Sequence, residues 1–116
     1  MGWTYWRKIS DKNYWYTEDF DNEGPACYEL GVGHSSTRVS IKYVGETGNE
    51  KQRISQYARH GSHLSKEIDD YLKRGFNLYY RAVGMSSKRA AVQMQDRMLY
   101  KYKYDWNIHH NIEDDD

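Results

Sequence analysis

Three tyrosines and an arginine occur along this chain as an ordered set that could serve acid–base or anion-binding chemistry. Tyr28 lies near the start of one alternating apolar stretch and Tyr43 near the end of the next. Arg53 follows Tyr43 by ten residues, and Tyr57 follows Arg53 by four. A guanidinium forms strong charge-assisted hydrogen bonds to anions. A free phenol has a pKa of about 10, so it needs a nearby cation to act as an acid or base at neutral pH.

Hydrophobic periodicity predicts the strands that would carry these tyrosines. Apolar residues alternate, as in strands, over residues 27–32, 39–43 and 76–82. Residues 33–36 have the composition of a turn, so the first two strands are expected to form a β-hairpin. If Tyr28 and Tyr43 face the same side of this hairpin, their hydroxyls can serve one site. Gly45 is expected to begin a break in the second strand.

Helix signals complete the predicted fold. Thr47 and Glu50 have the spacing of a capping box, which predicts a helix start there. A second amphipathic helix is expected to end at Gly75, and Ser86 or Ser87 can cap a last helix. The element order predicts an α/β (α+β) domain in which a small three-stranded antiparallel sheet is flanked by helices. The inner face of the last helix is expected to hold Ala91, Met94, Met98 and Tyr102.

The ordered set resembles the GIY-YIG endonuclease family, small metal-dependent enzymes that cut phosphodiester bonds in DNA. Pro25-Ala26-Cys27-Tyr28 is similar to the first family motif, and Tyr43-Val44-Gly45 is similar to the second. The family's arginine, the histidine or tyrosine four residues later, and the closing asparagine correspond to Arg53, Tyr57 and Asn107. The resemblance implies a three-stranded antiparallel sheet between helices, in agreement with the predicted elements.

The resemblance also implies roles for these residues in metal-assisted hydrolysis by an activated water. Tyr28 and Tyr43 would orient or deprotonate the water. Arg53 would hold a non-bridging phosphate oxygen. Tyr57 would hydrogen-bond the phosphate or the water, and Asn107 would order the loop beside the metal.

Gln95 departs from the family, whose members carry a metal-binding and catalytic glutamate at the position twelve residues before Asn107. A neutral amide is a poor ligand for Mg²⁺, which prefers carboxylate and water oxygens. We therefore expect Mg²⁺ (or Mn²⁺) to bind only with a carboxylate at position 95. Two interpretations stay open: an inactivated form of a nuclease, or a natural nucleic-acid-binding module that has lost its metal site. Glu46, directly after the second motif, could join a metal shell or cap the following helix.

The formal net charge is zero, but the charges are unevenly distributed. Residues 51–103 contain twelve Lys and Arg against four Asp and Glu, a balance of +8, whereas residues 1–50 have −3 and residues 104–116 have −5. A basic middle suits a phosphate-binding face, although helices with solvated lysines would give the same balance. The predicted DNA-contacting residues are Lys51, Arg59, His63 and Lys101.

Composition divides the chain into an aromatic N-terminal arm (1–24), the nuclease-like domain (25–107) and an acidic C-terminal tail (108–116). The rings of the arm could pack on the domain, form a self-association surface, or stack on bases if they are exposed. A zinc site is a weaker alternative, because Cys27 is the lone cysteine beside five histidines and no second paired motif is present. The aromatic residues of the arm are Trp3, Tyr5, Trp6, Tyr14, Trp15 and Tyr16.

Length and composition narrow the function further. A chain of 116 residues has room for one domain without a separate recognition domain. It has no apolar run long enough for a membrane span and no signal-like N-terminus, and its lone cysteine fits a reducing compartment, so a cytoplasmic protein is expected. The favoured function is a compact DNA endonuclease of restriction or phage type, with homodimerisation as one route to target choice. The alternatives are a non-catalytic nucleic-acid-binding module and a protein-interaction domain that uses the aromatic arm.

Overall fold

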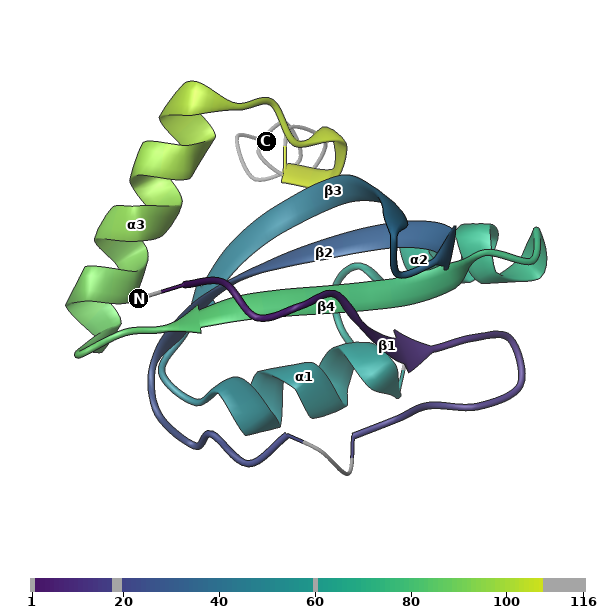
Figure 1. Cartoon of the computed structure of the whole chain (residues 1–116), viewed down its shortest axis with the longest axis horizontal. Helices are drawn as coiled ribbons and strands as arrows, with labels where there is room; N and C mark the ends of the chain where they lie inside the picture. The colour runs from purple at the N-terminus through teal and green to yellow at the C-terminus, as the bar shows by residue number, and fades with distance from the viewer. Residues whose placement is uncertain (1, 18–19, 60, 108–116) are drawn as a thin grey trace.

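A computed structural model of the chain describes residues 2–17, 20–59 and 61–107. The strands form one antiparallel sheet in the order β1-β4-β2-β3, with helices packed against it (Figure 1). The predicted α+β fold is confirmed, with one strand more than the three expected. The elements are β1 (Arg7–Ser10), β2 (Ala26–Ser35), β3 (Arg38–Thr47), α1 (Glu50–Ala58), α2 (Ser65–Lys73), β4 (Asn77–Gly84) and α3 (Lys88–Lys101).

The additional strand, β1, comes from the aromatic arm. Arg7 pairs with Tyr80 and Ser10 with Leu78 on β4, and the register shifts between Lys8 and Ser10. Four residues interrupted by a shift are too few to give a clear alternation, so the pattern did not predict this strand. Ile9 is fully buried in the main core, and part of the arm is therefore integral to the sheet.

The alternation along β2 separates two cores on opposite faces of the sheet. Tyr28, Leu30 and Val32 belong to the larger core, which also contains the buried residues of α1 and α2. Cys27 points the other way, into a smaller core with Val44, where Met94, Met98 and Leu99 of α3 pack. Figure 1 shows α3 set apart from α1 and α2. None of the described helices has the length and apolar character needed to cross a bilayer.

The turn between β3 and α1 differs from the prediction. Gly45 does not break the strand, because it pairs with Tyr28 in the β2–β3 ladder and β3 continues to Thr47. The predicted capping box is also wrong: Asn49 is the N-cap, and its side chain accepts a hydrogen bond from the Gln52 amide at 3.1 Å. The Thr47 hydroxyl instead accepts from the Asn49 amide at 3.0 Å and holds the turn.

The other helix boundaries follow the sequence signals. Gly75 has a φ of +91° directly after the end of α2, a conformation that favours glycine. Ser87 caps α3 by accepting from the Ala90 amide at 3.0 Å. Tyr102 does not lie on the inner face of α3 as predicted. The helix ends at Lys101, and Tyr102 has an extended backbone and a side chain exposed to solvent.

Replacing Ile9 by alanine tests whether β1 is integral to the fold. Because Ile9 is fully buried, we expect Ile9→Ala to lower the free energy of unfolding by about 2–5 kcal/mol. Ile41 is 40% exposed on β3, so Ile41→Ala is a matched control that should cost less than about 1 kcal/mol. Urea denaturation followed by circular dichroism measures both. Equal, small effects would show that the arm does not stabilise the domain.

Candidate functional site

Two buried tyrosines and a half-buried arginine form the centre of the candidate site, between the sheet and α1. The hydroxyls of Tyr28 on β2 and Tyr57 on α1 are 2.7 Å apart and hydrogen-bonded. Arg53, one turn before Tyr57, donates from Nη1 to the Tyr28 hydroxyl at 3.4 Å. Tyr28 and Tyr57 are fully buried, whereas Arg53 is half-buried. Arg53 is therefore accessible to a ligand from solvent, while its contact with the two buried phenols holds the guanidinium in position.

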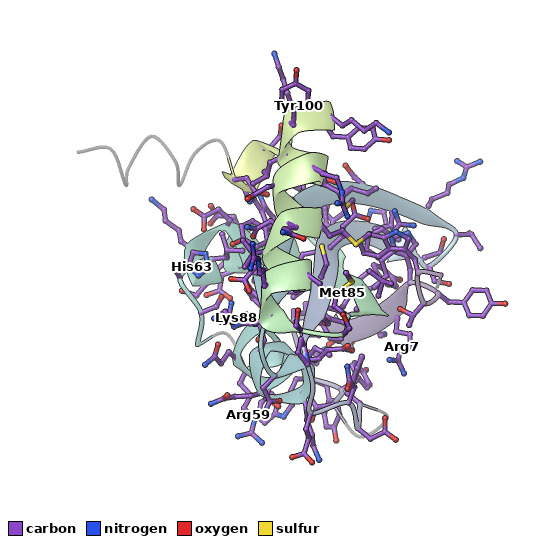
Figure 2. All side chains as sticks on the ribbon, turned by 90° about the vertical axis from the view of Figure 1, so that its left-hand side faces the viewer. Arg7, Arg59, His63, Met85, Lys88 and Tyr100 are labelled. Carbon is purple, nitrogen blue, oxygen red and sulfur yellow. The ribbon has the colours of Figure 1, made fainter. Side chains whose placement is uncertain are left out.

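Tyr43 and His63 form the outer part of the same cluster. The Tyr43 ring lies 6.3 Å from that of Tyr28 and 6.4 Å from that of Tyr57, measured between centroids. Its hydroxyl is 3.4 Å from Nε2 of His63, whose imidazole packs edge-on against the Tyr43 ring. His63 precedes α2 and is exposed, as Figure 2 shows. We call Tyr28, Tyr43, Arg53, Tyr57 and His63 the tyrosine–arginine cluster.

Gly45 explains why the second motif ends in glycine. It is the cross-strand partner of Tyr28, and the Tyr28 phenol lies directly over its backbone. A Cβ on residue 45 would collide with the Tyr28 hydroxyl and would lie 2.9 Å from Cε2 of Tyr43. Glycine thus makes room for both motif tyrosines on one face of the hairpin. The sequence marks this position, but its steric role is visible only in the structure.

Burial determines the protonation state of the cluster. Loss of solvent raises the pKa of Tyr28, Tyr43 and Tyr57 well above that of a free phenol. The positive charge of Arg53 lowers all three pKa values, but by less than burial raises them. The three phenols are therefore neutral at pH 7. In this state each phenol carries its proton and can donate a hydrogen bond.

Asn107 lies at the free edge of β3. Its Oδ1 accepts from the Val44 amide and its Nδ2 donates to the Val44 carbonyl, both at 2.8 Å. Val44 belongs to the second motif, between Tyr43 and Gly45, so Asn107 fixes the backbone that carries the outer tyrosine. Asn107 is itself buried.

Gln95 has no hydrogen bond to the tyrosine–arginine cluster among the described residues. It is half-buried on α3, whose packing residues belong to the smaller core on the opposite face from Tyr28. The sequence predicted that Gln95 converges with the other site residues; the structure brings together the other four, Tyr28, Tyr43, Arg53 and Tyr57, and adds His63.

The described residues offer no group of three or more His, Cys, Asp and Glu side chains arranged to hold a metal ion. Burial raises the pKa of the Cys27 thiol to about 12, which makes it an inert core residue. The histidines at 60, 109 and 110 and the tail 108–116 lie outside the described residues. Glu46 carries the carboxylate of most interest, because its charge raises the pKa of Tyr43 and its Oε2 is buried without a hydrogen-bond partner. Glu46 does not cap α1, since Asn49 does so.

The predicted DNA-contacting residues fall on different parts of the surface. Lys51 and Arg59 are exposed on α1 and at its C-terminal end, and His63 belongs to the cluster. Lys101 is exposed at the far end of α3. In Figure 2, Arg59 and His63 lie well away from Tyr100, the neighbour of Lys101.

The fold and the site together define an α+β domain in which a hairpin and the following helix present tyrosines and an arginine on one face of the sheet. The chain belongs to the GIY-YIG family: the family described as GIY-YIG domain-containing protein matches residues 7–115. Family membership suggests a nuclease-type function. The match includes β1, which the sequence prediction had placed in the arm.

A curated relative is Protein EFFECTOR OF TRANSCRIPTION 3 of Arabidopsis thaliana, which is 26% identical over 140 aligned residues. The alignment includes 97% of this chain and 52% of the relative, so the chain spans about half the length of that protein. No solved structure matches the chain.

Replacing Gly45 by alanine tests the close packing of the second motif on Tyr28. The added methyl group would overpack the site, so we expect Gly45→Ala to lower the free energy of unfolding by about 1–3 kcal/mol. The control is Gly84→Ala, because a Cβ on residue 84 meets no atom within 4 Å; its effect should stay within about 0.5 kcal/mol. Chemical denaturation of the two variants measures this difference. Equal stabilities would contradict the proposed steric role.

Proposed function

We propose that the tyrosine–arginine cluster binds a phosphodiester of DNA, and that the domain hydrolyses this bond with a divalent cation when position 95 carries a carboxylate. The observation that carries the proposal is the direct contact between Arg53, Tyr28 and Tyr57, which brings a cation and two phenols from separate elements to one place. With Gln95, the chain is proposed to bind DNA and to cut it poorly.

Each residue of the cluster has a role that its geometry supports. The half-buried guanidinium of Arg53 would donate to a non-bridging phosphate oxygen, where partial desolvation strengthens a charge-assisted hydrogen bond. Tyr43 and His63, the outer pair, would orient the attacking water or the phosphate. Tyr28 and Tyr57 would hold Arg53 and Tyr43 in place, which matches their full burial.

The residues now present do not fit a bound Mg²⁺. Position 95 offers a neutral amide, and the described part of the chain contains no cluster of acidic and imidazole ligands. Glu46 could supply one carboxylate, because its Oε2 is buried without a hydrogen-bond partner. One carboxylate is few for a hydrated Mg²⁺ beside an anionic phosphate, and a carboxylate at position 95 would add a second. Because Gln95 makes no hydrogen bond to the cluster among the residues described, the ion would have to reach the phosphate through its own water shell.

The second candidate is a natural DNA-binding module without catalytic activity. Gln95 favours it, because an amide at the metal position removes the charge that catalysis needs while the phosphate-binding cluster stays intact. Both candidates bind DNA through the same interface. They differ in that a carboxylate at position 95 restores cleavage in the nuclease and does not in the binding module. A restriction-type or phage-type target choice belongs to the first candidate.

DNA binding by the present chain tests the interface common to both candidates. We expect Arg53→Ala to weaken binding of a labelled duplex by about 1–3 kcal/mol, because it removes a guanidinium–phosphate pair. Arg38, exposed at the start of β3, provides the control Arg38→Ala, which should change affinity little. Fluorescence anisotropy over a salt series measures both, and affinity should fall steeply as salt rises. Equal affinities of the two variants would remove Arg53 from the interface.

Restoring the carboxylate at position 95 separates nuclease from binding module. We expect Gln95→Glu to increase cleavage by on the order of a thousandfold, because metal-centred stabilisation of a transition state is commonly worth several kcal/mol. The gain should require Mg²⁺ or Mn²⁺ and disappear with chelator. Calorimetric titration with Mg²⁺ gives an independent readout, in which Gln95→Glu binds the ion and the present chain does not.

Two further variants serve as controls for the gain. Gln95→Asn preserves the neutral amide, so it should neither bind Mg²⁺ nor cleave. Tyr43→Phe in the Gln95→Glu background should lose the restored activity while remaining folded. If Gln95→Glu stays folded and binds DNA but cuts none of a panel of substrates, the domain is the binding module.

A further inference from the structure

A groove lies on the α3 face of the sheet, opposite the core that contains Tyr28. It consists of two adjoining cavities of about 690 and 460 Å³, whose linings share Trp3, Met98 and Tyr102. Trp3 brings the N-terminal arm to one wall, where Thr4 is hydrogen-bonded to Ala82 of β4. The C-terminal half of α3 supplies the other wall. Figure 1 shows the arm beginning beside α3 and passing in front of β4.

Exposed aromatic rings mark the end of this groove. Tyr100 is 94% exposed and Tyr102 is 55% exposed, and both line the larger cavity. Figure 2 shows Tyr100 projecting into solvent from the end of α3. Met94 and Met98, which pack on the smaller core, give the groove an apolar floor. Flat exposed rings above an apolar floor are suited to stacking with planar ligands.

The groove is also positively charged. Arg97 and Lys101 line the larger cavity and Lys103 the smaller one, and none of the three forms a salt bridge with another residue that the structure describes. The linings of the two cavities contain two carboxylates. One of them, Asp96, forms no salt bridge with a residue that the structure describes. The second carboxylate of the lining, Glu29, is paired with Arg81, so an anionic ligand is favoured.

The carboxylate of Glu29, which lines the smaller cavity, has a partner on each of its two oxygens. Arg81 contacts its Oε1 from Nη2 at 2.6 Å and from Nε at 2.7 Å. The Tyr104 hydroxyl donates to Oε2 at 2.7 Å. Because its charge is compensated inside the protein, Glu29 does not cancel the positive charge of the groove walls.

We propose that this groove binds an unpaired strand of the nucleic acid whose phosphate occupies the tyrosine–arginine cluster. Bases would stack on Tyr100 and Tyr102, and phosphates would pair with Arg97, Lys101 and Lys103. Rings together with unpaired cations favour a single strand over a duplex, whose bases are already stacked. They also favour a single strand over an acidic peptide, which needs the cations alone. The proposal deepens the proposed function and rests on it for the identity of the ligand as nucleic acid.

The test is binding of a fluorescein-labelled oligothymidylate of about 20 nucleotides, longer than the site of one small domain. We expect the full chain with Tyr100→Ala and Tyr102→Ala together to lose affinity by about 30-fold or more, since two rings are removed and stacking is worth about 1–3 kcal/mol per base. Tyr14→Ala is the matched control, because Tyr14 is also 55% exposed but lies outside the groove; its affinity should not change. Lys101→Ala should make the fall of log affinity with log salt concentration less steep, by about the amount that one phosphate contact contributes.

Two outcomes would overturn the proposal. One is equal affinity of the double variant and Tyr14→Ala for the oligothymidylate. The other is that polyglutamate displaces the oligothymidylate as well as an unlabelled oligothymidylate does, which would assign the groove to acidic proteins. The single variant Tyr100→Ala keeps the test valid if the double variant does not fold, because a side chain exposed to this degree contributes little to stability. Arg53→Ala measured on a duplex reports on the cluster separately, so failure of the groove and failure of the proposed function are distinguishable.

Discussion

The structure depends on the packing of the Tyr28 ring against the backbone of Gly45, a residue without a side chain. Tyr28 reaches Tyr57 on α1 and Arg53 only because Gly45, its partner on β3, leaves space for its ring. The Tyr28 ring also stacks on Tyr80 of β4 at 5.5 Å. One side chain thus joins two strands and a helix. The chemistry of the site and the packing of the larger core therefore rest on the same contact, and neither can change without the other.

The two faces of the sheet have different physical characters. On the α1 face, the hydroxyls of Tyr28 and Tyr57 are hydrogen-bonded to each other, and burial maintains both phenols in the neutral form. On the α3 face, the buried carboxylate of Glu29 is paired with the partly exposed guanidinium of Arg81. The guanidinium also lies against the rings of Trp3 and Trp6, at 5.1 and 4.5 Å from their centroids. The arm is thereby anchored to the sheet by a cation–π contact as well as by the pairing of β1.

The sequence predicted the fold where a local pattern decides the structure. The hairpin, the glycine after α2 and the serine cap of α3 follow from alternation, from positive φ and from a side-chain acceptor, all of which act within a few residues. The spacing of Tyr28, Tyr43, Arg53 and Tyr57 likewise predicted their meeting. The pairing of β1 with β4 joins segments about 70 residues apart, and no local pattern encodes it. The environment of Gln95 depends on how α3 packs, which its own periodicity could not specify.

The amide of Asn107 reproduces, with one side chain, the pair of hydrogen bonds that a neighbouring strand would offer to Val44. It occupies the sheet edge where another polypeptide would otherwise add in register. The opposite edge is β1, which is short and interrupted by a register shift, and such an edge is a poor template for further pairing. Both borders of the sheet thus carry a feature that disfavours strand addition. Removing the segment that carries Asn107 would open one of them, and the resulting hazard would be aggregation through β3.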